Sequence, residues 1–132
     1  MDASMITLSL LKYIENGGFG AIDDDLFFQK LTLDRIGVYI TNIGDTQVRG
    51  ARRSQSYELY SRGASDVDGY KRLSAIIDYL NGSYGVCQLP AVPPVTDSGY
   101  ENVTIMPLST ISSVGLDANN RMIYSATGTI IY

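Results

Sequence analysis

Residues 56–80 read SYELYSRGASDVDGYKRLSAIIDYL and predict a strand that is followed directly by a helix. From Ser56 to Arg62 the side chains alternate with the two-residue period of a β-strand, so Tyr57, Leu59 and Ser61 share one face. A helical period begins within a few residues of this strand. The change of period predicts a β–α unit, and the other predicted elements lie on either side of it.

The helix of this unit is expected to begin at Ser65, whose hydroxyl can cap the first turn, and to end at Asn81-Gly82. Asp66 and Asp68 suit the positive end of the helix dipole. The apolar stripe of the helix consists of Val67, Tyr70, Leu73, Ile77 and Leu80, with Ile76 at its flank. We expect this stripe to pack across one face of a sheet.

Toward the N-terminus, an amphipathic helix is expected from Ala3 to Glu15 and is ended by Gly17-Gly18. Its apolar face is formed by Ile6, Leu8, Leu10, Leu11, Tyr13 and Ile14. Strands are expected at Leu26 to Phe28 and at Arg35 to Ile40. One side of the second of these strands carries Ile36, Val38 and Ile40.

Two stretches show no clear period. Thr41 to Gln55 is rich in turn-forming residues, and we expect an extended loop or a projecting hairpin there. Residues 90–102 contain Pro90, Pro93 and Pro94, so we expect a long irregular connector.

The C-terminal part is expected to consist mostly of strands. They are placed at Tyr84–Leu89, at Val103–Leu108 with Ile111–Leu116 as its extension, and at Arg121–Tyr132 after a turn at Asp117–Asn120. The order of elements predicts one α+β domain over residues 1–132, with a mixed, largely antiparallel β-sheet covered by two α-helices.

The composition excludes most catalytic chemistry. The chain has no histidine and one cysteine, Cys87, so histidine-based triads, imidazole metal sites and an internal disulfide are ruled out. We therefore expect no enzyme activity, no catalytic residue, no cofactor and no metal, and we expect Cys87 to be a small buried apolar residue. No apolar run is long enough for a membrane-spanning helix, and no signal peptide is expected. The net charge of −4 argues against a duplex-DNA binder.

Two charged groups are candidate interface residues. Asp23, Asp24 and Asp25 can line an acidic channel or rim, bind a hard cation, or be solvated in a loop, and their spacing does not match an EF-hand.

Arg49, Arg52 and Arg53 form the dense basic group. Their guanidinium groups can bind carboxylates of a neighbouring subunit bidentately. The alternatives are a solvated loop face and a small nucleic-acid contact. The ten tyrosines are expected to divide between the core and contact surfaces.

The layout of the chain resembles the tail terminator proteins of long-tailed bacteriophages, a minor capsid or tail completion group. The resemblance has four pieces. They are an N-terminal helix ending in Asn16-Gly17-Gly18-Phe19-Gly20, a strand at 38–40 before a glycine-bearing loop, Ser56–Gly63 followed by the helix Tyr70–Leu80, and Asp117-Ala118-Asn119-Asn120-Arg121 before the strand 123–132. Residues 41–55 and 90–100 look long for the family, so its contacts there are not transferred.

The resemblance implies a structural virion protein that is assembled in the host cytoplasm as a ring, typically a hexamer. The ring would cap the head-proximal end of the tail tube, end tube polymerisation and provide the head–tail joining surface. Its partners would be further copies of the chain, the tail tube protein and a head-completion protein, while DNA passes through the lumen without specific binding. The alternatives are another neck component, such as a head-completion or stopper protein, and a small cytosolic adaptor or ligand-binding module.

Overall fold

The computed structural model describes residues 6–28, 36–50, 52–82, 86–92, 99–117 and 120–132. In chain order its elements are α1 (Ile6–Asn16), β1 (Leu26–Phe28), β2 (Gly37–Arg49), β3 (Arg52–Arg62), α2 (Asp66–Gly82), β4 (Val86–Leu89), β5 (Tyr100–Ile105), β6 (Ser112–Leu116) and β7 (Met122–Ile131). The described strands form one sheet in the order β1-β2-β3-β7-β5-β4, and β6 also pairs with β7. Only the β1–β2 pair is parallel among these described strands. The expected α+β class with a mixed, largely antiparallel sheet is confirmed.

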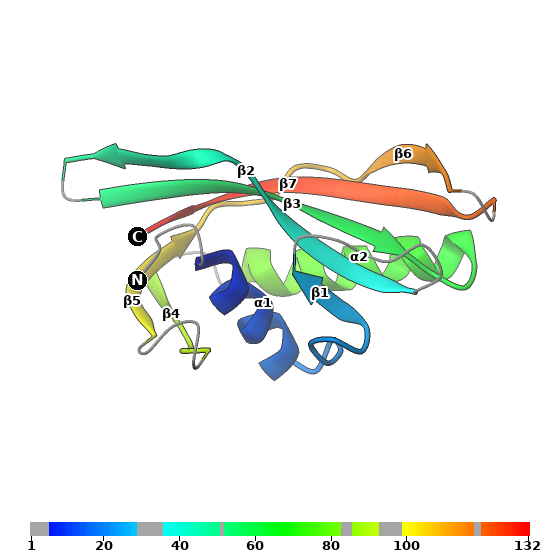
Figure 1. Ribbon diagram of the computed structural model, residues 1–132, viewed down its shortest axis with the longest axis horizontal. Helices are drawn as coiled ribbons and strands as arrows, with labels where there is room; N and C mark the ends of the chain where they lie inside the picture. Colours follow the sequence, from blue (N-terminus) through cyan, green and yellow to red (C-terminus); the bar gives the residue numbers. More distant parts are fainter. Residues whose placement is uncertain (1–5, 29–35, 51, 83–85, 93–98, 118–119) are drawn as a thin grey trace.

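Both helices lie against the same face of the sheet (Figure 1). α2 packs on β3 and β7, whereas α1 contacts β1, β2, β3 and β4. The strands at both edges of the sheet curl toward α1, and residues 6–11 of this helix are therefore all buried. Gly18 follows the helix with a φ of +88°, a conformation that glycine adopts without strain, and α1 ends where the sequence predicted.

The predicted β–α unit is confirmed at the junction of β3 and α2. Tyr57, Leu59 and Ser61 are each fully buried on the face of β3 that meets the helices. The Ser61 hydroxyl donates a hydrogen bond to the Gly69 carbonyl at 2.9 Å. Gly63 lies so close to Gly69 that a Cβ on Gly63 would be 2.4 Å from the Gly69 nitrogen. This backbone contact brings the first turns of α2 down onto the end of β3.

The Ser65 cap is also confirmed, since its hydroxyl accepts a hydrogen bond from the Asp68 N–H at 3.2 Å. The N-terminal half of the predicted stripe is wrong, however. Val67 and Tyr70 are 60% and 48% exposed, because Gly69 takes the position that faces the sheet in these turns. The C-terminal half of the stripe is buried as expected, and Ile76 belongs to it fully.

The prediction of a long loop at residues 41–55 is wrong, and the hairpin alternative is confirmed. β2 continues to Arg49 and pairs with β3 down to Arg52. The register shifts between Ile43 and Gln47, where Gly44 has a φ of +67°. The buried Gln55 amide donates to the carbonyl oxygens of Ile43 at 3.5 Å and Gly44 at 3.2 Å, which satisfies the backbone at this irregular point.

Other boundaries differ by a few residues. β2 begins at Gly37, so Ile36 lies outside the strand and is 41% exposed instead of facing the core. β5 begins at Tyr100, which shortens the expected connector 90–102 at its end. Ile111–Leu116 does not extend β5: Ser112–Leu116 is a separate strand that pairs with β7. Some predicted positions lie outside the described residues. They are the helix start at Ala3, the strand starts at Arg35 and Tyr84, the connector prolines Pro93 and Pro94, and the turn residues Ala118 and Asn119.

Candidate interaction surface

Large apolar side chains are exposed at two opposite ends of the sheet. We call Ile43–Arg49 with Arg52–Ser54 the hairpin arm; it projects beyond the helical layer (Figure 1). On the arm, Ile43 is 42% and Val48 is 64% exposed. The other end, which we call the β6 end, consists of β6 and the first two turns of α2. β3 runs from the tip of the arm at Arg52 to Arg62 at the other end, so these two far points are about 30 Å apart.

The β6 end carries the larger apolar area. Val114 and Leu116 of β6 are both 56% exposed, and Val67 and Tyr70 of α2 are 60% and 48% exposed. The two parts are joined through β7, since the Asp66 carboxylate accepts a hydrogen bond from the Met122 N–H at 3.1 Å and the Tyr70 ring meets Tyr124 edge-on at 5.5 Å. Exposed apolar side chains grouped in this way are typical of a protein contact.

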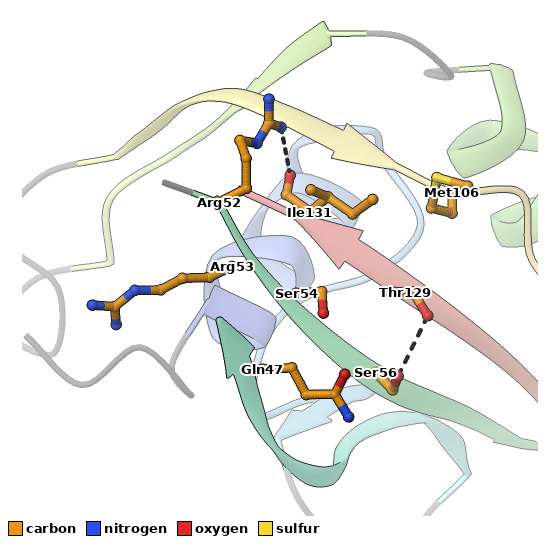
Figure 2. Close-up of a pocket in the computed structure, with 8 residues that line it drawn as sticks. All are labelled: Gln47, Arg52, Arg53, Ser54, Ser56, Met106, Thr129 and Ile131. Carbon is orange, nitrogen blue, oxygen red and sulfur yellow. Dashed lines mark hydrogen bonds between the residues drawn. The ribbon is translucent and has the colours of Figure 1, made fainter. Parts of the chain in front are cut away.

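The hairpin arm is anchored by the C-terminus of the chain. Arg53 and Tyr132 exchange two backbone hydrogen bonds, with N···O distances of 2.6 and 2.8 Å. Arg52 reaches across the end of β7, where its guanidinium donates to the carbonyl oxygens of Asn102 at 3.2 Å and Ile131 at 3.4 Å. Figure 2 shows the hydrogen bond from Arg52 to Ile131, while the side chain of Arg53 extends away from Ile131.

The backbones of the three predicted arginines lie together at the tip of the arm, although the side chains of Arg52 and Arg53 point in different directions (Figure 2). Arg49 pairs with Arg52 through the backbone, directly before and after the turn, although the side chain of Arg49 is outside the described ones. Arg52 and Arg53 are exposed. The result is a basic tip on a projecting arm, which suits contact with carboxylates of another molecule.

A groove of about 570 Å³ lies beside the arm on the sheet face that neither helix covers. It is lined by Gln47, Arg52, Arg53, Ser54, Ser56, Met106, Thr129 and Ile131 (Figure 2). The Ser56 and Thr129 hydroxyls lie 3.4 Å apart on its floor. This lining offers hydroxyl groups, apolar surface and guanidinium groups but no carboxylate or thiol, so it can bind a chain segment but has no general base. The open shape does not resemble an enclosed small-molecule site.

The predicted acidic group has a different arrangement. Asp25 forms an ion pair with Arg72 of α2 at 2.8 Å and accepts a hydrogen bond from the Ala21 N–H at 2.7 Å. Partial burial raises the pKa of Asp25, but the hydrogen bonds from Ala21 and Arg72 outweigh it and the pKa is lowered overall. Asp25 thus ties the loop before β1 to α2 within one copy.

Asp23 and Asp24 are exposed in the same loop, and Asp23 has a φ of +71° in the turn. The loop lies beside the start of β2, because the Val38 N–H donates a hydrogen bond to the Asp25 carbonyl. The arginines lie at the far end of β2. The structure therefore does not bring the two predicted charged groups together.

An ion cluster that the sequence analysis missed lies beneath the β6 end. The Asp117 carboxylate is 2.9 Å from the Arg62 Nε and accepts hydrogen bonds from the Arg121 Nε at 3.0 Å and its N–H at 2.8 Å. The side chains of Arg62 and Asp117 are only 7% and 5% exposed. This cluster fixes the turn before β7 to the end of β3. The spacing of Asp117 and Arg121 signals their pairing, but nothing local points to Arg62.

The tyrosines of the uncovered face do not act as acids or bases near neutral pH. Tyr39 and Tyr60 stack with ring centroids 4.7 Å apart. The hydrogen bond that Tyr60 donates to Glu58 at 2.6 Å, together with burial, raises the pKa of Tyr60 to about 12. Burial also raises the pKa of Tyr39.

In the described part of the chain, no group of three or more acidic or cysteine side chains is placed to hold a metal ion. Cys87 is partly exposed rather than fully buried, and burial raises the pKa of its thiol. Neither described helix is long and apolar enough to cross a membrane. No known family model matches this chain, and no characterised protein is significantly similar to it in sequence.

Proposed function

We propose that this chain is a structural virion subunit that assembles into a ring, typically a hexamer, at the head-proximal end of a long phage tail. As a tail terminator it would end polymerisation of the tail tube and present a joining surface to a head-completion protein. The resemblance of the sequence to that family suggests this role, and the α+β fold is compatible with it.

The observation that carries the proposal is the exposure of large apolar side chains at two opposite ends of the sheet. Val48 lies at one end, and Val114 and Leu116 lie at the other. A surface used for a two-fold dimer would meet itself, whereas two different surfaces at opposite ends favour head-to-tail contact. Head-to-tail contact closes into a ring when the rotation between copies allows it.

The net charge supports a passage for DNA. At −4 per copy, a ring of this chain would repel phosphates on average, and the exposed Asp23 and Asp24 are candidates for its lumen or rim. A strongly basic lining would hold DNA by releasing counterions and would slow its transit. Arg49, Arg52 and Arg53 then belong to contacts between proteins.

The experiment is native mass spectrometry of the purified chain, followed by electron microscopy after mixing with tail tube protein. We expect one closed oligomer and tubes capped at one end. A chain that stays monomeric at every concentration and never binds the tube would contradict the proposal. Binding to the portal-side protein without binding to the tube would indicate a different neck component.

A further inference from the structure

We propose that the hairpin arm of one copy pairs edge to edge with β6 of the next copy, so that one β-sheet continues across the subunit boundary. This inference rests on the self-assembly proposed above and adds which two surfaces meet. The occupant of each edge is therefore a second copy of this chain.

Both segments are sheet edges in the part of the chain that the structure describes. β1 covers β2 only from Val38 to Ile40, and no other described strand pairs with the outer side of the arm. β6 pairs with β7 alone among the described strands. The backbone N–H and C=O groups along such edges can form a ladder with another chain.

The two edges differ in how far they are protected against such pairing. β6 has the sequence SSVGL, without a charge or a proline, whereas the arm segment IGDTQVR contains Asp45 and Arg49 but no lysine or proline. Each edge also has one register shift, between Ile43 and Gln47 in the arm and between Ser113 and Gly115 in β6. Val48 is 64% exposed on the arm, and Val114 and Leu116 are each 56% exposed on β6. β-Branched side chains facing each other across a strand pair stabilise it, so Val48 and Val114 suit a shared sheet.

Charge favours β6 over the other edges as the partner of the arm. Arg52 and Arg53 are exposed on the arm, and Asp66 and Asp68 are exposed in the first turn of α2, where Asp66 is hydrogen-bonded to Met122 beside β6. Lys71 and the largely buried cluster of Asp117 with Arg62 and Arg121 offset this negative charge, so the complementarity comes from the exposed carboxylates alone. The edge strands β1 and β4 curl toward α1 instead. Among the described side chains of these two strands, none of the large apolar ones is exposed.

The positions of the two edges make the contact intermolecular. β3 and β7 lie between β2 and β6 in the sheet, so one copy cannot pair its own arm with its own β6. Each added copy uses one edge and leaves the other open, so the chain of contacts ends only when the ring closes.

Two substitutions test this pairing by breaking one edge each. Val48→Asp places a carboxylate on the arm where the pairing would bury it against the apolar side chains of β6, and Val114→Lys places a cation on β6 facing the exposed arginines of the arm. We expect either variant alone to need at least about tenfold higher concentration to assemble, because the buried carboxylate would lack a partner and the cation would face like charge. Ala75→Lys, on an exposed part of α2, is the matched control and should assemble like the wild type.

The decisive measurement is native mass spectrometry of the two variants mixed in equal amounts. The intact arm of Val114→Lys can still bind the intact β6 of Val48→Asp, and at the other contact the carboxylate introduced at position 48 faces the cation introduced at position 114 with opposite charge. We expect the mixture to assemble at a lower concentration than either variant alone, into oligomers that contain both variants. Thermal melts that match the wild type will show that both variants fold.

Each other outcome counts against the inference. If the wild type forms rings and either variant does the same at the same concentration, edge pairing is wrong while the proposed function stands. The same holds if both variants are folded monomers but their mixture forms no oligomer that contains both variants. A wild type that never assembles would contradict both proposals.

Discussion

The strand pair β2–β3 runs through two different environments. In its covered half, Val38, Ile40 and Leu59 are fully buried beneath the helices. In the hairpin arm the same two strands continue without a helical layer, and Val48 is 64% exposed. One hairpin therefore provides both core and contact surface. Substitutions in the covered half should change the stability of each copy, and substitutions in the arm should change assembly.

The largest loss of stability is expected from Asp117→Ala, at the closed end of the covered half. The change leaves the Arg62 guanidinium, which is 7% exposed, without its carboxylate. Breaking a buried ion pair on one side costs about 3–5 kcal/mol. Urea denaturation will measure the change in the free energy of unfolding. Asp78→Ala, at an exposed position of α2, is the control, and equal stability of both variants would mean that the cluster contributes nothing.

Leu73→Ala is expected to lower the free energy of unfolding by about 2–5 kcal/mol, because the side chain is fully buried between α2 and the sheet. Val67→Ala, on the same predicted stripe, should cost less than about 0.5 kcal/mol, since Val67 is 60% exposed. Thermal and urea melts of both variants separate the buried part of the stripe from the exposed part. Similar losses at the two positions would show that Val67 packs in the core.

The covered half could be predicted from the sequence because burial imposes a period on it. Tyr57, Leu59 and Ser61 alternate with outward side chains, since only one face of β3 meets the helices. The arm has solvent on both sides, so no alternation marks it, and its turn-forming residues favoured a loop. Periodicity also identifies the apolar face of α2, but it does not show how far the sheet extends beneath that face. For this reason Val67 was predicted to pack on the sheet, although it is exposed.

The candidate site could be predicted only where its residues are close in sequence. Three arginines within five positions marked the tip of the arm. The contact between Arg62 and Asp117 depends on the register of β3 against β7, which no local pattern reveals. The partner of Asp25 is also distant, since Arg72 lies on a helix that reaches the loop only after the fold has formed.

A smaller, pH-dependent effect is expected at that second contact. Asp25→Asn should lower stability by about 1 kcal/mol at pH 7, because the charged carboxylate holds Arg72 and the Ala21 N–H. The pKa of Asp25 is lowered in the folded state, so its contribution is complete above the usual value of 3.8 and is lost as the pH falls through the folded pKa.

Urea denaturation of the wild type and Asp25→Asn at several pH values will therefore show two stabilities that converge in acid. Asp24→Asn, in the same loop but exposed, should match the wild type throughout. A constant difference between wild type and Asp25→Asn down to the lowest pH would mean that the carboxylate charge is not what stabilises the loop.

The smallest change in stability is expected in the arm itself. Replacing Arg49, Arg52 and Arg53 together by alanine should alter the free energy of unfolding by less than about 1 kcal/mol, since exposed hydrogen bonds contribute little. Assembly should nevertheless weaken, because we propose that these side chains bind carboxylates of another copy. Sedimentation velocity will measure the loss, which should be greatest at low salt, where unscreened charges matter most.

Replacing the same three residues by lysine is the matched control for this variant. Lysine keeps the charge but loses the bidentate geometry, so assembly should fall between that of the wild type and that of the alanine variant. If the lysine variant matches the alanine variant, geometry rather than charge makes the arm a contact. If the alanine variant keeps the oligomer size and tail attachment of the wild type, the arm binds through its backbone edge and Val48 without its arginines.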